Sequence, residues 1–126
     1  MIKTVTLQTA KLLKESGFKQ NSHFCHYLNK HEDTAINTTA DCLFYPVEFW
    51  DIFSAPTSDE LLEEIPYGLR CTDCDYWLNI QKSRFDTYDV RYTDAFHNNV
   101  KIIEQGENLP EAIARMWLCL KKEKLI

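Results

Sequence analysis

Two cysteines three residues apart have a spacing that could support chemistry. Cys71 and Cys74 stand in the stretch RCTDCDYW, in the C-x-x-C pattern that metal sites and thiol redox enzymes use. A structural zinc site needs four ligands, usually two such pairs. The segment SHFCHY could supply the rest, because it carries His23, Cys25 and His26. A zinc site would therefore join Cys71 and Cys74 to side chains of this segment.

We interpret Cys71 and Cys74 instead as reduced, partly buried side chains beside the start of a strand, and we expect no metal and no cofactor. A single C-x-x-C without a matching second pair is weak evidence for zinc, and cysteine in a reduced core behaves as a small hydrophobic residue. Thiol redox chemistry is disfavoured as well. Asp73 and Asp75 flank Cys74, and nearby carboxylates raise the pKa of a thiol.

A nucleophilic cysteine paired with a histidine is the other chemistry to consider. Cys25 could pair with any of four histidines, His23, His26, His31 and His97. None of these residues lies in a recognisable local signature of a cysteine enzyme. The sequence also lacks a P-loop, a dinucleotide-binding glycine pattern and a metalloprotease helix. We therefore predict no catalytic residues and no enzymatic activity.

Charge is distributed unevenly along the chain, whose net charge is −5. Residues 1–30 carry five lysines and one glutamate, whereas residues 31–64 carry nine acidic residues and no lysine or arginine. These blocks can pair with each other once the chain folds. Alternatively, the acidic block receives a basic partner or imitates the charge of nucleic acid. Direct binding to DNA or RNA is disfavoured, because it needs clustered lysine and arginine.

The length and composition predict one domain over residues 1–126. A chain of 126 residues with 44% hydrophobic and 26% charged residues can bury a single core without the help of disulfides or a bound metal. It has no apolar run long enough to span a membrane and no signal-peptide block, so we expect a cytoplasmic protein that does not bind membranes. Its five cysteines are then expected to be reduced thiols.

Three segments have the periodicity and the end signals of helices. The first spans residues 7–16 and precedes Gly17, which suits the left-handed residue after a helix. The second is short, begins with a capping box of Thr57 and Glu60, and ends at Pro66.

The third helix begins at Asn108, with Glu111 at the capping-box position. It carries a wide apolar face that includes Trp117, and its lysines lie at the C-terminal end, where the helix dipole favours cations. We expect this helix to lie across a sheet and to bury Trp117 in the core.

Strand signals lie between the helices. Residues 76–81 and 85–92 alternate between apolar and polar side chains, which predicts two antiparallel strands joined by a short turn. Residues 42–53, interrupted by a proline, predict an edge strand or two short strands. A further short strand is expected at residues 100–103, and residues 19–40 are expected to be mostly loop. The predicted fold is α+β, an antiparallel sheet of about three to five strands packed by N-terminal, short central and C-terminal helices.

Three segments in this order resemble small uncharacterised proteins encoded by phages, prophages and other mobile elements of gut Bacteroides-type bacteria. They are TLQTAKLLKESGF near the start, APTSDELLEEIP in the middle and LPEAIARMWLCL near the end. The matched positions are helix caps and core residues, so the resemblance implies a fold and carries over no catalytic residue.

The expected function is that of a non-enzymatic phage or mobile-element accessory protein. It would act through protein–protein contacts on its aromatic and acidic surface, with an unknown protein partner. The alternative is a small zinc-binding structural module that uses the C-x-x-C of Cys71 and Cys74.

Overall fold

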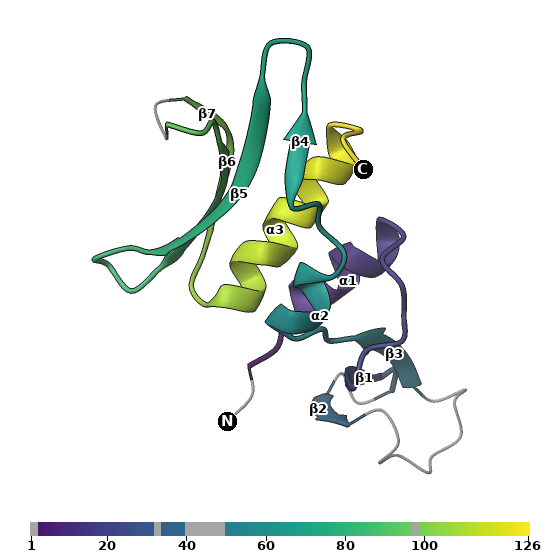
Figure 1. Cartoon of the computed structure of the whole chain (residues 1–126). Helices are drawn as coiled ribbons and strands as arrows, with labels where there is room; N and C mark the ends of the chain where they lie inside the picture. Colours follow the sequence, from purple (N-terminus) through teal and green to yellow (C-terminus); the bar gives the residue numbers. More distant parts are fainter. Residues whose placement is uncertain (1–2, 32–33, 40–49, 97–98) are drawn as a thin grey trace.

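The computed structural model describes residues 3–31, 34–39, 50–96 and 99–126. These residues form three helices and two antiparallel sheets, which confirms the α+β class (Figure 1). In chain order the elements are α1 (Leu7–Glu15), β1 (Phe24–Asn29), β2 (Ala35–Thr39), β3 (Trp50–Ser54), α2 (Ser58–Leu62), β4 (Gly68–Arg70), β5 (Asp75–Lys82), β6 (Tyr88–Thr93), β7 (Val100–Gly106) and α3 (Leu109–Lys122).

The smaller sheet has three strands in the order β2-β1-β3, and its first two strands correct the sequence prediction. Residues 19–40 were expected to be mostly loop, yet they contain β1 and β2, which pair antiparallel with His26 opposite Asn37. Alternation is missing here because β1 buries three consecutive residues, Cys25 to Tyr27, while β2 is exposed over its first three residues. Pairing between strands, rather than a local pattern, makes this sheet.

The third strand of this sheet overlaps the end of the predicted strand region 42–53. Residues 50–54 form β3, an edge strand of the described sheet that pairs antiparallel with β1. The rest of that prediction, residues 42–49 with Pro46, lies outside the described residues.

The larger sheet has four strands in the order β4-β5-β6-β7 and curls into a half-barrel (Figure 1). The predicted hairpin is confirmed as β5 and β6, with Ile80 opposite Val90. β4 was not predicted, because its three residues are too few to show an alternating pattern. β7 is longer than the four residues expected, because its pairing with β6 continues to Gly106, opposite Tyr88.

All three helices contribute to one apolar core against the larger sheet. Leu13 of α1, Leu61 of α2 and Val90 of β6 are fully buried in it. Trp117 of α3 is 5% exposed and meets the ring of Phe18 edge to face at 5.1 Å, so its predicted core position is confirmed. Burial of such a side chain stabilises the fold by about 2–3 kcal/mol.

The predicted helix ends are largely confirmed. Gly17 has a φ of +91°, as the left-handed position after α1 requires. Thr57 and Glu60 form the expected capping box of α2, although this helix ends at Leu62, before Pro66. None of the helices in the described chain is long and apolar enough to cross a membrane.

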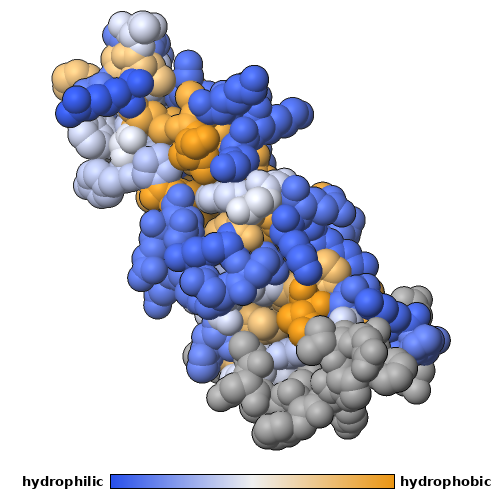
Figure 2. All heavy atoms as spheres, turned by 90° about the vertical axis from the view of Figure 1, so that its right-hand side faces the viewer, coloured by the Kyte–Doolittle hydropathy of each residue, from blue (hydrophilic) through white to orange (hydrophobic). Residues whose placement is uncertain are grey.

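The acidic block pairs with the basic block where the structure describes both. The ammonium of Lys19 contacts the carboxylate of Glu64, and Lys30 Nζ lies 3.4 Å from Asp51 Oδ1. The hydrogen bond with Glu64 raises the pKa of Lys19. In the view of Figure 2 hydrophilic residues cover much of the surface, with hydrophobic patches between them. Ion pairs within the chain therefore neutralise part of the negative charge of the acidic block, residues 31–64.

Candidate functional site

The C-x-x-C motif lies at the turn between β4 and β5. Cys71 N donates a hydrogen bond to Cys74 O at 3.2 Å, which closes the turn. Both thiols are free and half-buried, and they pack against the core directly before β5 begins. Asp73 in the turn accepts a hydrogen bond from Tyr76 Oη at 2.7 Å, and this bond lowers the pKa of Asp73.

The other half of the candidate zinc site lies at β1 in the smaller sheet. The ring of His26 is buried, and its Nε2 donates to Val5 O at 2.7 Å. Burial raises the pKa of Cys25, which keeps its thiol protonated and poorly nucleophilic. Within the described residues, no three His, Cys, Asp or Glu side chains are placed to hold a metal ion. The structure thus leaves Cys71 and Cys74 apart from this segment.

The other two described histidines, His23 and His31, lie at the surface. The exposed ring of His23 packs edge to face on Phe24, at 4.9 Å between ring centroids. His31 follows β1 on the surface, and His97 lies outside the described residues.

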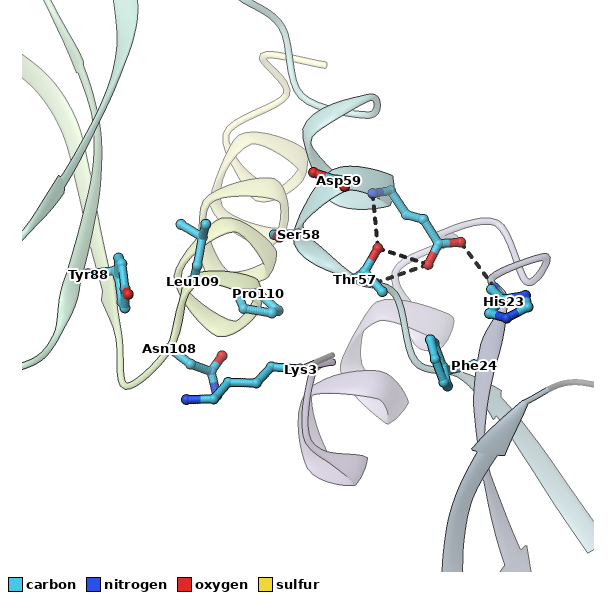
Figure 3. A pocket seen from close by; sticks show the side chains of 11 residues that line it. Lys3, His23, Phe24, Thr57, Ser58, Asp59, Tyr88, Asn108, Leu109 and Pro110 are labelled. Carbon is cyan, nitrogen blue, oxygen red and sulfur yellow. Dashed lines mark hydrogen bonds between the residues drawn. The ribbon is translucent and has the colours of Figure 1, made fainter. Parts of the chain in front are cut away.

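A hollow of about 650 Å³ lies where α2, α3 and β1 begin (Figure 3). Its size falls in the range of small-molecule pockets. Its lining mixes caps, aromatic rings and charges, namely Lys3, His23, Phe24, Thr57, Ser58, Asp59, Glu60, Tyr88, Asn108, Leu109 and Pro110.

Polar groups at this hollow serve the backbone. Glu60 Oε1 accepts from Thr57 N at 3.1 Å, and Glu60 Oε2 accepts from His23 N at 3.1 Å (Figure 3). Asn108 Oδ1 accepts from Glu111 N at 3.0 Å. The side chains that cap α2 and α3 are therefore engaged in holding these helix ends in place.

Glu111 corrects the prediction for the start of α3. Its carboxylate does not return to Asn108 as a capping box would require. Instead, Oε1 accepts from Thr6 N at 2.5 Å and Oε2 accepts from Thr9 Oγ1 at 2.6 Å. The residue is only 4% exposed, so a buried carboxylate ties the start of α3 to the start of α1. Both oxygens have partners, which makes Glu111 a structural group rather than a general base.

The larger sheet also has an outer face, meaning the face turned away from α3, which no described helix covers (Figure 1). Alternation along the strands sends Tyr76, Val90 and Tyr92 into the core beneath α3. In Figure 1 no helix of the described chain lies over the opposite side of the sheet. The side chains that alternate onto this outer face include Trp77, Asn79, Asp89, Arg91 and Ile103.

A polar cluster of Asn79, Asp89 and Arg91 occupies the middle of the outer face. Arg91 Nη2 donates to Asp89 Oδ2 at 3.1 Å, and Asp89 is only 8% exposed. Three buried atoms of this cluster have no hydrogen-bond partner among the described residues: Asn79 Oδ1, Asp89 Oδ1 and Arg91 Nε. Unpaired buried polar atoms are uncommon because each costs about 1–3 kcal/mol.

Two aromatic rings stand at the β4 side of the outer face. Trp77 is 44% exposed and lies 5.8 Å from the ring of Tyr67, which is 77% exposed. Gly68 permits this arrangement, because a Cβ at that position would lie 2.9 Å from the indole of Trp77. The outer face thus presents large aromatic surface beside an incompletely paired ionic cluster.

The outer face is the better candidate site of the two. At the hollow, the capping groups bond one another or the backbone, whereas on the outer face three polar atoms remain unpaired. Sequence alternation indicated the residues of this face, but nothing local to them showed that α3 would cover the other side.

A scan against protein-family models found no match for this chain, and searches of curated proteins and of solved structures found none either. What the chain binds therefore has to be inferred from its own side chains.

Proposed function

We propose that this chain is a non-enzymatic phage or mobile-element accessory protein that acts through protein–protein contacts on the outer face of its larger sheet. The unpaired atoms of Asn79, Asp89 and Arg91, set beside exposed Trp77, are the observation that carries this proposal. A partner that reorients Arg91 allows these atoms to pair and so recovers part of the cost of leaving them unpaired.

The residue types on the outer face also support a protein partner. Trp, Tyr and Arg are the side chains most enriched in binding hot spots, and Trp77, Tyr67 and Arg91 lie on or beside this face. The acidic segment is a weaker candidate, because Asp51 and Glu64 already form ion pairs. The resemblance of the three helical segments to phage and mobile-element proteins supports the genetic context.

Affinity capture from host cells that carry the gene tests this function. The full chain, immobilised as wild type, is compared with a variant carrying Trp77→Ala and Tyr67→Ala. Phe85→Ala is the matched control, because Phe85 is an exposed aromatic residue in the β5–β6 turn. Glu63→Lys reports on the acidic segment, since Glu63 is exposed on the surface beside α2.

We expect one defined protein to be retained by wild type and by the Phe85 variant and to be lost from the Trp77 and Tyr67 variant. Loss of a hot-spot tryptophan weakens binding by about thirtyfold. Equal retention of every captured protein by that variant would rule out the outer face. If the captured protein were lost with Glu63→Lys instead, the contact would be assigned to the acidic segment.

A further inference from the structure

The outer face of the larger sheet is electrically neutral, although the chain as a whole is acidic. Its charged strand residues are two of each sign, namely Arg70, Asp75, Asp89 and Arg91. Lys101, at the bulge of β7, directs its ammonium to the ring of Tyr76, which is a core side chain. The net charge of the chain is −5. Two copies of it therefore repel each other least where such neutral faces meet.

The polar cluster in the middle of this face has unpaired atoms of both kinds. Arg91 Nε is a donor, whereas Asp89 Oδ1 and Asn79 Oδ1 are acceptors. None of the three has a hydrogen-bond partner among the described residues. A protein that pairs all of them has to supply one acceptor and two donors at the right places.

The register of β5 and β6 arranges the cluster symmetrically about Val90. On one side of Val90, Arg91 lies opposite Asn79. On the other side, Asp89 lies opposite Gln81. A two-fold axis that runs across the two strands at Val90 exchanges these sides, so that each pair of one copy faces the other pair of the second copy.

We propose that the outer face binds a second copy of this chain about such an axis. Arg91 of each copy then faces Asp89 of the other, and Asn79 of each copy faces Gln81 of the other. Contacts of this kind are isologous, and two-fold dimers built from them are the commonest soluble oligomers. This inference rests on the proposed function, because it names the partner of the same face.

The second copy supplies a partner for every unpaired atom of the cluster. Rotation of the Arg91 side chain brings Nε to Asp89 Oδ1 of the other copy, and the two symmetric contacts close a ring of alternating charges. Gln81 is exposed, and its side-chain amide can donate to Asn79 Oδ1 across the interface. A protein of different sequence has to match these atoms one by one, whereas a second copy matches them by symmetry.

Exposed apolar side chains on both sides of the cluster add contact area. Trp77 of β5 is 44% exposed, and Ile103 of β7 is 45% exposed. Their strands flank β6 in the sheet. Covering these side chains removes apolar surface from water and so favours association of the two outer faces.

An exchange of charges within the cluster tests the proposal. The double variant Asp89→Arg with Arg91→Asp keeps an opposite pair within each chain. Two variant copies still face each other with opposite charges, but a variant copy and a wild-type copy meet with like charges. ¹⁵N-labelled wild type is mixed with unlabelled variant, and native mass spectrometry counts the mixed dimers. The matched control, Lys30→Asp with Asp51→Lys, exchanges an exposed ion pair of the smaller sheet.

We expect light scattering to show that the wild type is a dimer, and we expect the control variant to mix freely with it. The charge-exchanged variant should dimerise with itself but give at least about tenfold fewer mixed dimers, because like charges across an interface are repelled. Gln81→Glu, at an exposed position that does not endanger the fold, should weaken the wild-type dimer about tenfold, because it replaces a donor by a carboxylate. Capture from host cells should retain the chain itself.

A wild type that stays monomeric at about 1 mM would overturn the proposal. If capture then retained a different protein, and the variant with Trp77→Ala and Tyr67→Ala lost it, the proposed function would stand without the second copy. A dimer that mixes freely with the charge-exchanged variant, or that is unchanged by Gln81→Glu, would also overturn the proposal, because the copies would then meet at another surface.

Discussion

The two sheets are held to the rest of the molecule by different forces. The larger sheet buries one apolar face beneath the helices, where Val90 and Tyr92 are fully buried. The smaller sheet contributes less to this core: Phe53 of β3 packs against it, whereas Ile36 on β2 is 45% exposed. Side-chain hydrogen bonds to backbone attach it instead: His26 Nε2 donates to Val5 O, and Lys14 Nζ donates to Ile52 O at 2.9 Å.

This difference explains why the β5–β6 hairpin was predictable from the sequence and the pairing of β1 with β2 was not. Apolar burial on one face leaves an alternating pattern that a reader of the sequence can find. A hydrogen bond from a side chain to a distant backbone group leaves no such pattern, because its partner can lie anywhere in the chain. Ser54 N, for example, donates to Gln20 Oε1 at 2.9 Å across 34 positions.

The largest effect should follow from removing the aromatic side chain beneath the larger sheet. Trp117→Ala should lower the free energy of unfolding by about 3–5 kcal/mol, because it leaves a cavity beside Phe18. Urea denaturation followed by circular dichroism measures this change. Leu12→Ala, at an exposed position on α1, is the control and should cost less than about 1 kcal/mol. A loss below about 1 kcal/mol for the tryptophan variant would contradict its core position.

Cutting the link between α1 and α3 should have the next largest effect. Glu111→Ala removes the acceptor of Thr6 N and Thr9 Oγ1, so we expect a loss of about 2–3 kcal/mol in the free energy of unfolding. Glu111→Gln keeps an acceptor oxygen and should cost less. Glu107→Ala, at an exposed residue directly before the N-cap Asn108, serves as the control. If both glutamate substitutions had equal, small effects, the buried carboxylate would not be the link.

Weakening the attachment of the smaller sheet should lower the free energy of unfolding by less than the two changes above. Its effect on hydrogen exchange should be confined to that sheet. His26→Ala removes the shorter of the two hydrogen bonds to Val5 O, which then keeps only the one from Thr4 Oγ1 at 3.3 Å, and should cost about 1–2 kcal/mol. Hydrogen exchange should speed up in β1 and β3 while the amides of β5 and β6 stay protected, because the two sheets share few stabilising contacts. His23→Ala, which removes an exposed ring, should leave exchange unchanged. Uniform loss of protection in both sheets would show that they unfold together.

The smallest effect is expected at the C-x-x-C turn. Cys71→Ser combined with Cys74→Ser should change the free energy of unfolding by less than about 1 kcal/mol, and a chelator should leave Tm unchanged. Metal analysis of protein purified without chelator provides the decisive measurement. Stoichiometric zinc that is lost in the double serine variant would favour the zinc-binding module over a protein-contact function.

At the candidate sites too, features that depend on nearby residues were predictable, and features that depend on distant segments were not. The alternation of residues 76–81 and 85–92 predicted two strands, but which of their faces stays uncovered depended on where α3 packs (Figure 1). The capping box at Thr57 was readable because its two partners are three residues apart. The reach of Glu111 to Thr6 was not readable, because it crosses 105 positions.

The sequence by itself determined the three helices, the capping box of α2 and the central hairpin, since each depends on residues within a few positions of one another. Only the tertiary structure decided that β1 and β2 pair, that Cys71 and Cys74 lie apart from the β1 segment with His26, and which face of the larger sheet stays uncovered. The physical reason is that these features depend on contacts between distant segments. Such contacts form only when the shared core makes burial outweigh the entropy of closing long loops.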